Sequence, residues 1–207
     1  MKEINEYEKD LASIRAMMER SVKFVSLSGL SGVLSGLYAL AGSIVVYMVL
    51  YYPFSPFGFR IHYIDEQTIL RNLVLVASSV LILSLATGYL LSLRKARTLG
   101  MSIWNPASRQ LFVDLIIPLA SGGLLIVILL MQGYYGIVAP ACLVFYGLAL
   151  IQGGRSTYDE IKYLGLTEIG LGLGCALLPG YGLIFWATGF GVMHIIYGTV
   201  MYFRYDR

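Results

Sequence analysis

Residues 69–93 read ILRNLVLVASSVLILSLATGYLLSL, and this stretch decides the fold class. Arg71 is its only charged side chain. A helix needs about 20 apolar residues to cross a hydrocarbon core of roughly 30 Å. Other stretches have the same character, so we expect an all-α integral membrane protein with six transmembrane helices. The expected spans are residues 24–50, 69–93, 111–131, 134–151, 164–178 and 181–203.

The composition excludes several other classes of protein. Of the 207 residues 57% are hydrophobic and 13% are charged, and a soluble chain of this size could not cover so much apolar surface. A net charge of +3 without a dense basic face argues against a nucleic-acid partner. The two cysteines are not in a Cys-x-x-Cys pair, so neither a disulfide framework nor a cysteine-built zinc site is expected.

Helix starts are predicted at two places outside the apolar runs. Asn105 followed by Pro106 is typical of a capped helix with proline in its first turn. Thr157 and Glu160 have the spacing of a capping box, which would open a helix near residue 158. The third and fifth spans would therefore begin before their apolar cores.

The turns at 132–134 and 179–181 are short, so the spans are expected to pair into three helical hairpins. The two turns match at a shift that also brings Gly123 onto Gly170. Three similar helix pairs would explain the match, and such repeats are common in membrane proteins. The sequence thus predicts a weak internal repeat.

Lysine and arginine residues predict the orientation, because cytoplasmic loops carry an excess of them. One side of the six spans has Lys2, Lys9, Arg15, Arg20, Lys23, Arg94, Lys95, Arg97, Arg109, Arg155, Lys162, Arg204 and Arg207. The other side has only Arg60 and Arg71. We therefore expect both termini in the cytoplasm and a location in the bacterial cytoplasmic (inner) membrane.

Residues 1–22 are expected to form a cytoplasmic amphipathic helix ahead of a bundle that covers 23–207. Its apolar residues recur at steps of three and four: Ile4, Tyr7, Leu11, Ile14 and Met18. Such a helix either lies on the lipid bilayer or docks a protein partner or a second copy of the chain.

Small residues predict close helix packing. The pairs Gly32–Gly36 and Gly170–Gly174 have the small-x-x-x-small spacing that lets membrane helices approach each other. The packing is either within one bundle or, through the first span, between copies in a homo-oligomer.

The segments 17–21 (Met-Met-Glu-Arg-Ser), 26–32 (Ser-Leu-Ser-Gly-Leu-Ser-Gly) and 179–198 together resemble a family of uncharacterised bacterial six-span membrane proteins. The last hairpin, with its Pro179-Gly180 turn and late Tyr197-Gly198 step, is also similar to that of the HdeD-type acid-resistance membrane proteins. The resemblance implies an inner-membrane location and supplies no catalytic residue.

Three ionisable residues within the spans are candidates for a polar site: Glu168, His194 and Asp114. Glu168 either titrates and exchanges protons with His194, or forms an ion pair with an arginine at the cytoplasmic rim. Asp114 lies close to Arg109, which favours a structural pair. His194 could equally be a neutral side chain hydrogen-bonded to a neighbouring helix.

The motifs of common enzymes and nucleotide-binding proteins are missing from the sequence, and two histidines are too few for a haem or di-metal site. We expect a protein without catalytic activity, cofactor or metal. Two functions remain open. The first is interaction with other proteins in assembly, stress response or regulation. The second is a small transporter or channel with a polar path through Glu168 and His194, which would be proton-linked if these side chains exchange protons.

Overall fold

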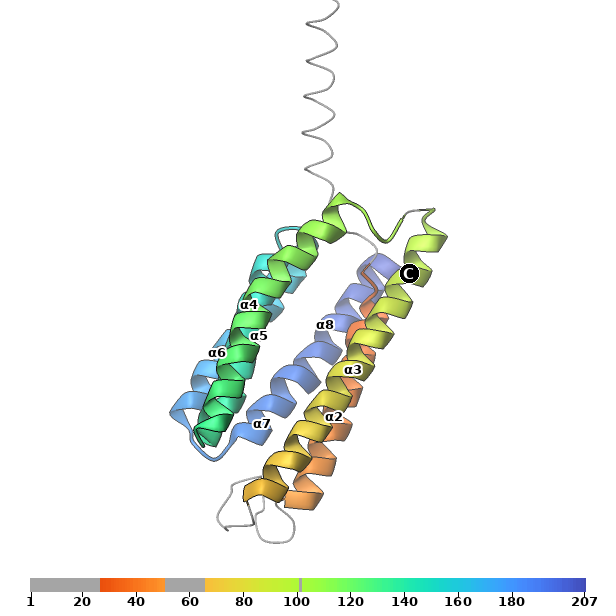
Figure 1. The fold of residues 1–207 in the computed structure, drawn as a ribbon. Helices are drawn as coiled ribbons and strands as arrows, with labels where there is room; N and C mark the ends of the chain where they lie inside the picture. The colour runs from red at the N-terminus through yellow and green to blue at the C-terminus, as the bar shows by residue number, and fades with distance from the viewer. Residues whose placement is uncertain (1–26, 51–65, 101) are drawn as a thin grey trace, which may run out of the picture.

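The structure is a computed structural model that describes residues 27–50, 66–100 and 102–207. Its first helices are α2 (Gly29–Leu50), α3 (Glu66–Thr98), α4 (Pro106–Met131), η2 (Tyr135–Ile137), α5 (Val138–Gly153) and α6 (Asp159–Leu177). The chain ends in one continuous helix, called the last helix below, made of α7 (Gly182–Trp186), η3 (Ala187–Met193), α8 (His194–Met201) and η4 (Tyr202–Asp206). These described ranges contain no strand, so the expected all-α class is confirmed (Figure 1). The helix expected in residues 1–22 lies outside them.

The two predicted helix starts have different outcomes. Asn105 caps α4 as expected, because its side chain accepts from the backbone of Ser108 at 2.9 Å while the Ser108 hydroxyl accepts from the backbone of Asn105 at 2.9 Å. Helix α6 begins at Asp159, close to the expected position, but its first turn has no side-chain cap. The capping box at Thr157 was wrong, because that hydroxyl donates back to the carbonyl of Gly153.

Within the described residues, five helices are long and apolar enough to cross a membrane: Gly29–Val49, Leu70–Thr98, Pro106–Met131, Tyr135–Gly153 and Gly182–Asp206. They correspond to five of the six expected spans and indicate an integral membrane protein. The expected span 164–178 lies within α6, whose 19 residues have a length of about 28 Å at 1.5 Å per residue. Charged side chains at its start and at Glu168 keep α6 out of this set.

The distribution of side chains is the reverse of that in a soluble protein. Large apolar side chains such as Leu85 and Leu124 are well exposed on the outside of the bundle. Among the fully buried side chains are Thr157 and Glu168. A continuous apolar exterior around a small-residue and polar interior suits a bilayer rather than water.

The helices form two groups of three, which Figure 1 shows side by side. In the α2 unit, α2 packs against both α3 and the last helix. In the α5 unit, α5 packs against both α4 and α6. The two units meet where the last helix lies against α5 and α6: α7 contacts both of them, and η3 and α8 contact α6.

Glycines bring α2 and the last helix into close contact. A Cβ atom on Gly32 would lie 3.0 Å from the Cα atom of Gly198, and one on Gly36 would lie 2.6 Å from the carbonyl oxygen of Gly191. Gly32 and Gly36 therefore face a neighbouring helix of the same chain. Larger residues there would force the two backbones apart.

The α5 unit uses a similar contact, but not at the glycine pair that the sequence singled out. A Cβ atom on Gly147 would lie 2.6 Å from the carbonyl oxygen of Gly165, so these two glycines pack α5 onto α6. A Cβ atom on Gly174 would lie 3.2 Å from the ring of Phe185. No atom of the described chain lies within 4 Å of the Cβ position of Gly170, so Gly170 plays no part in packing within this bundle.

The turns at Gly133 and Gly180 are both tight, with positive φ angles of 80° and 96° that favour glycine. The helices that follow them do not all pair as hairpins. Helix α6 packs chiefly on α5, and the last helix packs chiefly on α2, because their close glycine faces point to those partners. Gly123, like Gly170, has no neighbour within 4 Å in the described chain, so this pair of positions makes no equivalent contacts.

Residues 204–206, named the C-terminal latch here, join the two units at the end of the bundle where the chain terminates. In the α2 unit, the Asp206 carboxylate pairs with Lys95 and accepts from the Ser28 hydroxyl at 2.9 Å and the Gly29 backbone N–H at 2.7 Å. This carboxylate therefore caps the start of α2, where a negative charge is stabilising.

The same latch reaches the α5 unit through Glu160. Arg204 pairs with the Glu160 carboxylate at 2.7 Å, and the Tyr205 hydroxyl donates to it at 3.0 Å. The ring of Tyr205 lies 4.1 Å from that of Tyr158. Burial raises the pKa of Tyr158, and the nearby negative charge of Asp206 raises it further, so this phenol stays neutral.

Candidate functional site

Glu168 lies in the third turn of α6, at the interface between the two units. Its side chain is 0% exposed, and neither carboxylate oxygen has a hydrogen-bond partner within the described residues. A charged carboxylate without hydrogen bonds is costly to bury. The site therefore disfavours a bare negative charge at Glu168.

His194 lies opposite Glu168, at the point where the last helix returns from the wider π-helical segment η3 to α-helical geometry. Its side chain is buried, and its Nδ1 atom is 3.0 Å from the carbonyl oxygen of Gly189. Its Nε2 atom is 2.7 Å from the hydroxyl of Tyr146 on α5. Such π segments often occur at functional sites.

These contacts determine the tautomer of a neutral His194. The Gly189 carbonyl can only accept, so Nδ1 must carry a hydrogen and donate it. Nε2 then has the lone pair and accepts from the Tyr146 hydroxyl. If His194 gains a proton, both nitrogens donate and the Tyr146 oxygen becomes an acceptor.

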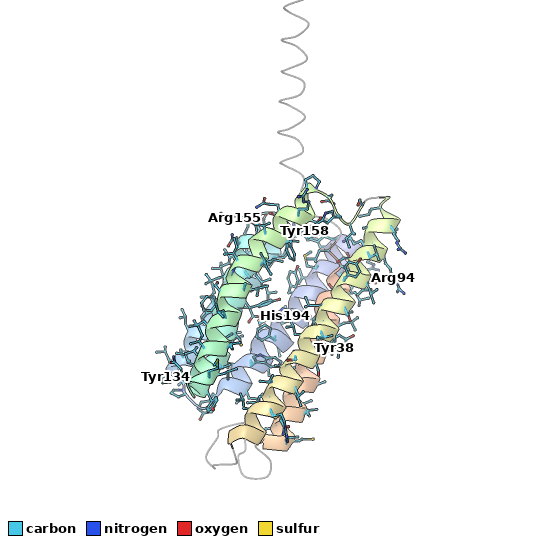
Figure 2. The ribbon with its side chains drawn as sticks, in the orientation of Figure 1. Tyr38, Arg94, Tyr134, Arg155, Tyr158 and His194 are labelled. Carbon is cyan, nitrogen blue, oxygen red and sulfur yellow. The ribbon has the colours of Figure 1, made fainter. Side chains whose placement is uncertain are left out.

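Glu168 and His194, named the buried pair here, are in direct contact. The Glu168 Oε1 atom lies 3.5 Å from Nδ1 of His194. Gly189 makes room for the carboxyl, because a Cβ atom there would collide with Glu168 Oε2 and with the side chain of Leu143. Figure 2 shows His194 in the middle of the molecule between the two units.

Aromatic rings surround the histidine side of the pair. Tyr146 and Phe190 have ring centroids 5.4 Å and 5.9 Å from that of His194, and Trp186 packs on Phe190 at 5.3 Å. The hydroxyl of Tyr197 is also buried without a partner in the described chain. The rings keep bulk water away, which strengthens electrostatic interactions within the cluster.

The third sequence candidate, Asp114, lies apart from the buried pair. Its side chain is buried near the C-terminal end of the bundle, where Gln110 donates to one carboxylate oxygen at 2.8 Å and Ser156 donates to the other at 2.7 Å. These bonds join α4 to the turn before α6. Asp114 is therefore satisfied by neutral donors, not by the neighbouring Arg109 that the sequence favoured.

The cytoplasmic-rim arginines suggested as partners for Glu168 do not reach it in the described structure. Arg94 and Arg155 lie at the C-terminal end of the bundle, away from His194 (Figure 2). Within the described residues, Glu160, two turns earlier in α6, pairs with an arginine. Of the two interpretations of Glu168, the geometry matches contact with His194.

Sequence reasoning missed Tyr146 and Gly189. Tyr146 lies within an apolar run, where a tyrosine has no distinctive signal, and Gly189 is one of many glycines. The one available hint is that a buried histidine must satisfy two ring nitrogens, so a hydroxyl and a free carbonyl were to be sought nearby.

Within the described residues no three histidine, cysteine, aspartate or glutamate side chains gather closely enough to hold a metal ion. Comparison of the chain with protein-family models, curated proteins and solved structures finds no match. The function is therefore argued from the geometry of the buried pair alone.

Proposed function

We propose that the protein is a six-span integral membrane protein of the bacterial cytoplasmic membrane in which α6 is the fifth span. Helix α6 packs along α5, and α7 starts after a tight turn at the far end of α6. If α6 crosses the bilayer, the basic residues of the described helices gather on one side. These are Arg94, Lys95, Arg97, Arg109, Arg155, Lys162, Arg204 and Arg207, against Arg71 at the other end. That asymmetry supports a cytoplasmic C-terminus.

The function that the site supports best is proton-linked transport, with the buried pair as the proton-binding group. The observation that supports it is the fully buried Glu168, whose oxygens lack hydrogen bonds and face His194 across the interface between the units. Ionisable groups in such positions mark proton paths in many membrane proteins. The sequence alone slightly favoured a role in protein interaction, and the geometry of the pair supports proton-linked transport instead.

The chemistry of the pair links its proton to the shape of the bundle. With one exchangeable proton, the pair is either a neutral carboxylic acid beside a neutral imidazole, or a carboxylate beside an imidazolium whose added proton is on Nε2, because Nδ1 already donates its hydrogen to Gly189. Loss of that proton leaves a net negative charge, which the closed site cannot stabilise. Release therefore requires the units to separate enough for water to reach Glu168, so opening and proton release occur together.

Other titratable groups near the pair do not replace it. Among them are buried or partly buried phenols and thiols on the helices of the two units: Tyr38, Cys142, Tyr146, Cys175 and Tyr197. The charged side chains of Glu160 and Arg204 pair with each other at the C-terminal end of the bundle. The proposal therefore depends on Glu168 and His194 alone.

The test is proton binding and proton movement by the purified full-length protein. Infrared difference spectra between acid and alkaline pH should show the C=O band of a buried carboxylic acid, and Glu168→Gln should remove it. In vesicles containing a pH-sensitive dye, an imposed pH gradient should drive proton movement that Glu168→Gln abolishes.

Asp114→Asn is the matched control, because Asp114 is also a buried carboxylate but both of its oxygens are hydrogen-bonded. It should leave proton movement unchanged. If Glu168→Gln folds, retains the infrared band and moves protons like the wild type, the proposed function is wrong.

A role in protein assembly remains the second proposal, and α3 supports it. None of the described residues of α3 from Leu70 to Leu91 is buried, and the helix packs chiefly on α2. Lipid, a second copy or another protein could cover this face, with the segment 1–22 as a further contact. Mass spectrometry of the protein in mild detergent tests this: a stoichiometric partner lost on deletion of 1–22 would favour assembly, and a lone monomer would count against it.

A further inference from the structure

The glycine contacts of the two units match residue by residue. In the α2 unit, a Cβ atom on Gly36 would meet the carbonyl of Gly191 at 2.6 Å and the Cγ1 atom of Ile195 at 2.7 Å. In the α5 unit, a Cβ atom on Gly147 would meet the carbonyl of Gly165 at 2.6 Å and the Cγ1 atom of Ile169 at 2.7 Å. The glycine and the isoleucine are four residues apart in both partner helices.

The match extends along both helices without a change of register. A Cβ atom on Gly198 would collide with the backbone of Val33, and one on Gly172 would lie 3.0 Å from the backbone nitrogen of Val144. Residues 33 and 36 in α2 thus correspond to residues 144 and 147 in α5. Numbers 191, 195 and 198 in the last helix correspond to 165, 169 and 172 in α6.

The third helix of each unit fits the same correspondence. Gly42 has Gly153 as its counterpart in α5. A Cβ atom on Gly42 would lie 3.1 Å from the side chain of Val76 and 2.8 Å from that of Val80, both on α3. A Cβ atom on Gly153 would lie 3.0 Å from the side chains of two residues of α4 with the same four-residue spacing, Leu111 and Leu115. Helices α2, α3 and the last helix therefore correspond to α5, α4 and α6.

The sequences agree where the contacts agree. Residues 191–198 read GVMHIIYG and residues 165–172 read GLTEIGLG. Residues 33–37 read VLSGL and residues 144–148 read VFYGL. In the first alignment His194 falls on Glu168.

Each helix runs in the opposite direction to its counterpart. Helix α2 starts at the C-terminal end of the bundle, where Gly29 contacts Asp206, whereas α5 ends there. Helix α6 starts at that end, where Glu160 pairs with Arg204 of the last helix, which ends there. The rotation that relates the units is therefore a two-fold axis across the helices, as in inverted-topology repeats.

We propose that the two units are inverted structural copies of each other. Glu168 and His194 then occupy equivalent positions in the two units, and they meet on the pseudo-two-fold axis. This inference rests on the proposed function and specifies its ligand and mechanism. The ligand is a single proton that the two equivalent positions hold between them, either on the carboxyl of Glu168 or on Nε2 of His194. Because the copies are inverted, one unit offers the proton to one face of the membrane and the other unit offers it to the opposite face.

Exchange of the two side chains tests the equivalence. Glu168→His alone places two histidines at the axis, and His194→Glu alone places two carboxyls there. Each single variant should reduce proton movement in vesicles by at least about tenfold, and the double exchange Glu168→His/His194→Glu should recover it to within about threefold of the wild type. The matched control exchanges a non-equivalent pair, Tyr146→His with His194→Tyr, which should not recover.

The outcomes separate the two proposals. A folded double exchange that moves protons no faster than the single variants overturns the equivalence but leaves the proposed function intact. Single variants that move protons like the wild type overturn the proposed function itself.

Side-specific labelling provides a second test if the double exchange does not fold. Leu164 and Phe190 are equivalent positions one turn from Glu168 and His194, displaced toward opposite ends of the bundle. In a Cys142→Ser/Cys175→Ser background, Leu164→Cys and Phe190→Cys should react with a membrane-impermeant thiol reagent from opposite faces of the vesicle. Reaction of both from the same face, or of neither, overturns the proposal.

Discussion

Asp114 and Glu168 are two buried carboxyl groups in the same small bundle, and their surroundings are opposite. Asp114 is 8% exposed and accepts one hydrogen bond at each oxygen, from Gln110 and from Ser156. Glu168 is 0% exposed and accepts none from the described residues. Asp114 joins two segments of one unit, whereas Glu168 lies where two units meet.

The different surroundings of Asp114 and Glu168 show that burial of an acidic residue does not by itself indicate function. A carboxyl whose oxygens are both hydrogen-bonded contributes to stability, because its partners offset the cost of leaving water. A carboxyl without such bonds costs stability, and the ionisable side chain beside Glu168 is that of His194. The first arrangement is that of a structural residue, Asp114. The second, at Glu168, lowers stability and is therefore better explained by a function.

The largest change in the free energy of unfolding is expected from Gly189→Ala, which alters the surroundings of Glu168. The added methyl group would collide with the Glu168 carboxyl and with Leu143 at the unit interface. We expect a loss of about 3 kcal/mol in the free energy of unfolding, at the upper end for overpacking of a core. Equilibrium unfolding in mixed detergent micelles measures it.

The control is Gly123→Ala, since the described chain has no atom within 4 Å of that Cβ position. This variant should be at least as stable as the wild type, because alanine favours a helix over glycine by about 1 kcal/mol. Equal stability of the two variants would contradict the packing of Gly189 against Glu168.

A direct comparison of the two carboxyls is the second prediction. Asp114→Asn should lower the free energy of unfolding by about 1–3 kcal/mol, because an amide nitrogen replaces an acceptor for Gln110 or Ser156. Glu168→Gln should change it by less than about 1 kcal/mol in either direction, because no hydrogen bond is lost. The same unfolding assay on both variants decides the matter, and the reverse order of effects would refute the contrast.

Much of the fold could be predicted from the sequence, because length and hydropathy determine which segments can be membrane helices. The all-α class, the five apolar spans and the cap at Asn105 follow from such local signals. The partners of the helices do not. Helix α6 precedes the turn at 179–181 that was expected to pair it with the last helix, yet its glycines place it against α5, and nothing local in the sequence says which face of a glycine-rich helix meets which neighbour.

The internal correspondence was hidden for a related reason. The central helix comes first in the α2 unit and second in the α5 unit, so no single shift of the sequence aligns the two units. Matching the turns of successive hairpins aligned Gly123 with Gly170, two positions that both face open space within the described chain. The contacts themselves were needed to align His194 with Glu168.

The candidate site was only half visible for the same reason. Glu168 and His194 stand out in the sequence because ionisable residues are rare in apolar helices. Tyr146 and Gly189 complete the cluster through the three-dimensional packing of α5 and the π segment η3 on α6.

A smaller effect is expected from Tyr146→Phe, which sharpens the role of the histidine in the comparison. The variant removes the hydroxyl that donates to Nε2 of His194 and leaves the ring contacts in place. Stability should fall by about 1 kcal/mol, the usual net worth of one buried hydrogen bond. The nitrogen NMR signal of His194 Nε2 should move, whereas Tyr163→Phe, at an exposed tyrosine, should leave it unchanged. An unmoved signal would show that Tyr146 does not donate to His194.

The smallest effect is expected at the C-terminal latch, where a third carboxylate completes the comparison. Glu160 has both an arginine and a tyrosine hydroxyl as partners, but Arg204 is mostly exposed to solvent, so the charge pair is screened. Arg204→Ala should therefore cost less than about 1 kcal/mol, and the cost should shrink further at high salt. Unfolding measurements at low and high salt test this, with Lys162→Ala, a charge of the same sign in an exposed local pair, as the control. A large, salt-independent loss would mean that Arg204 holds the units together as strongly as the buried contacts do. A small one leaves the interface around Glu168 and His194 as the place where the two units are free to separate.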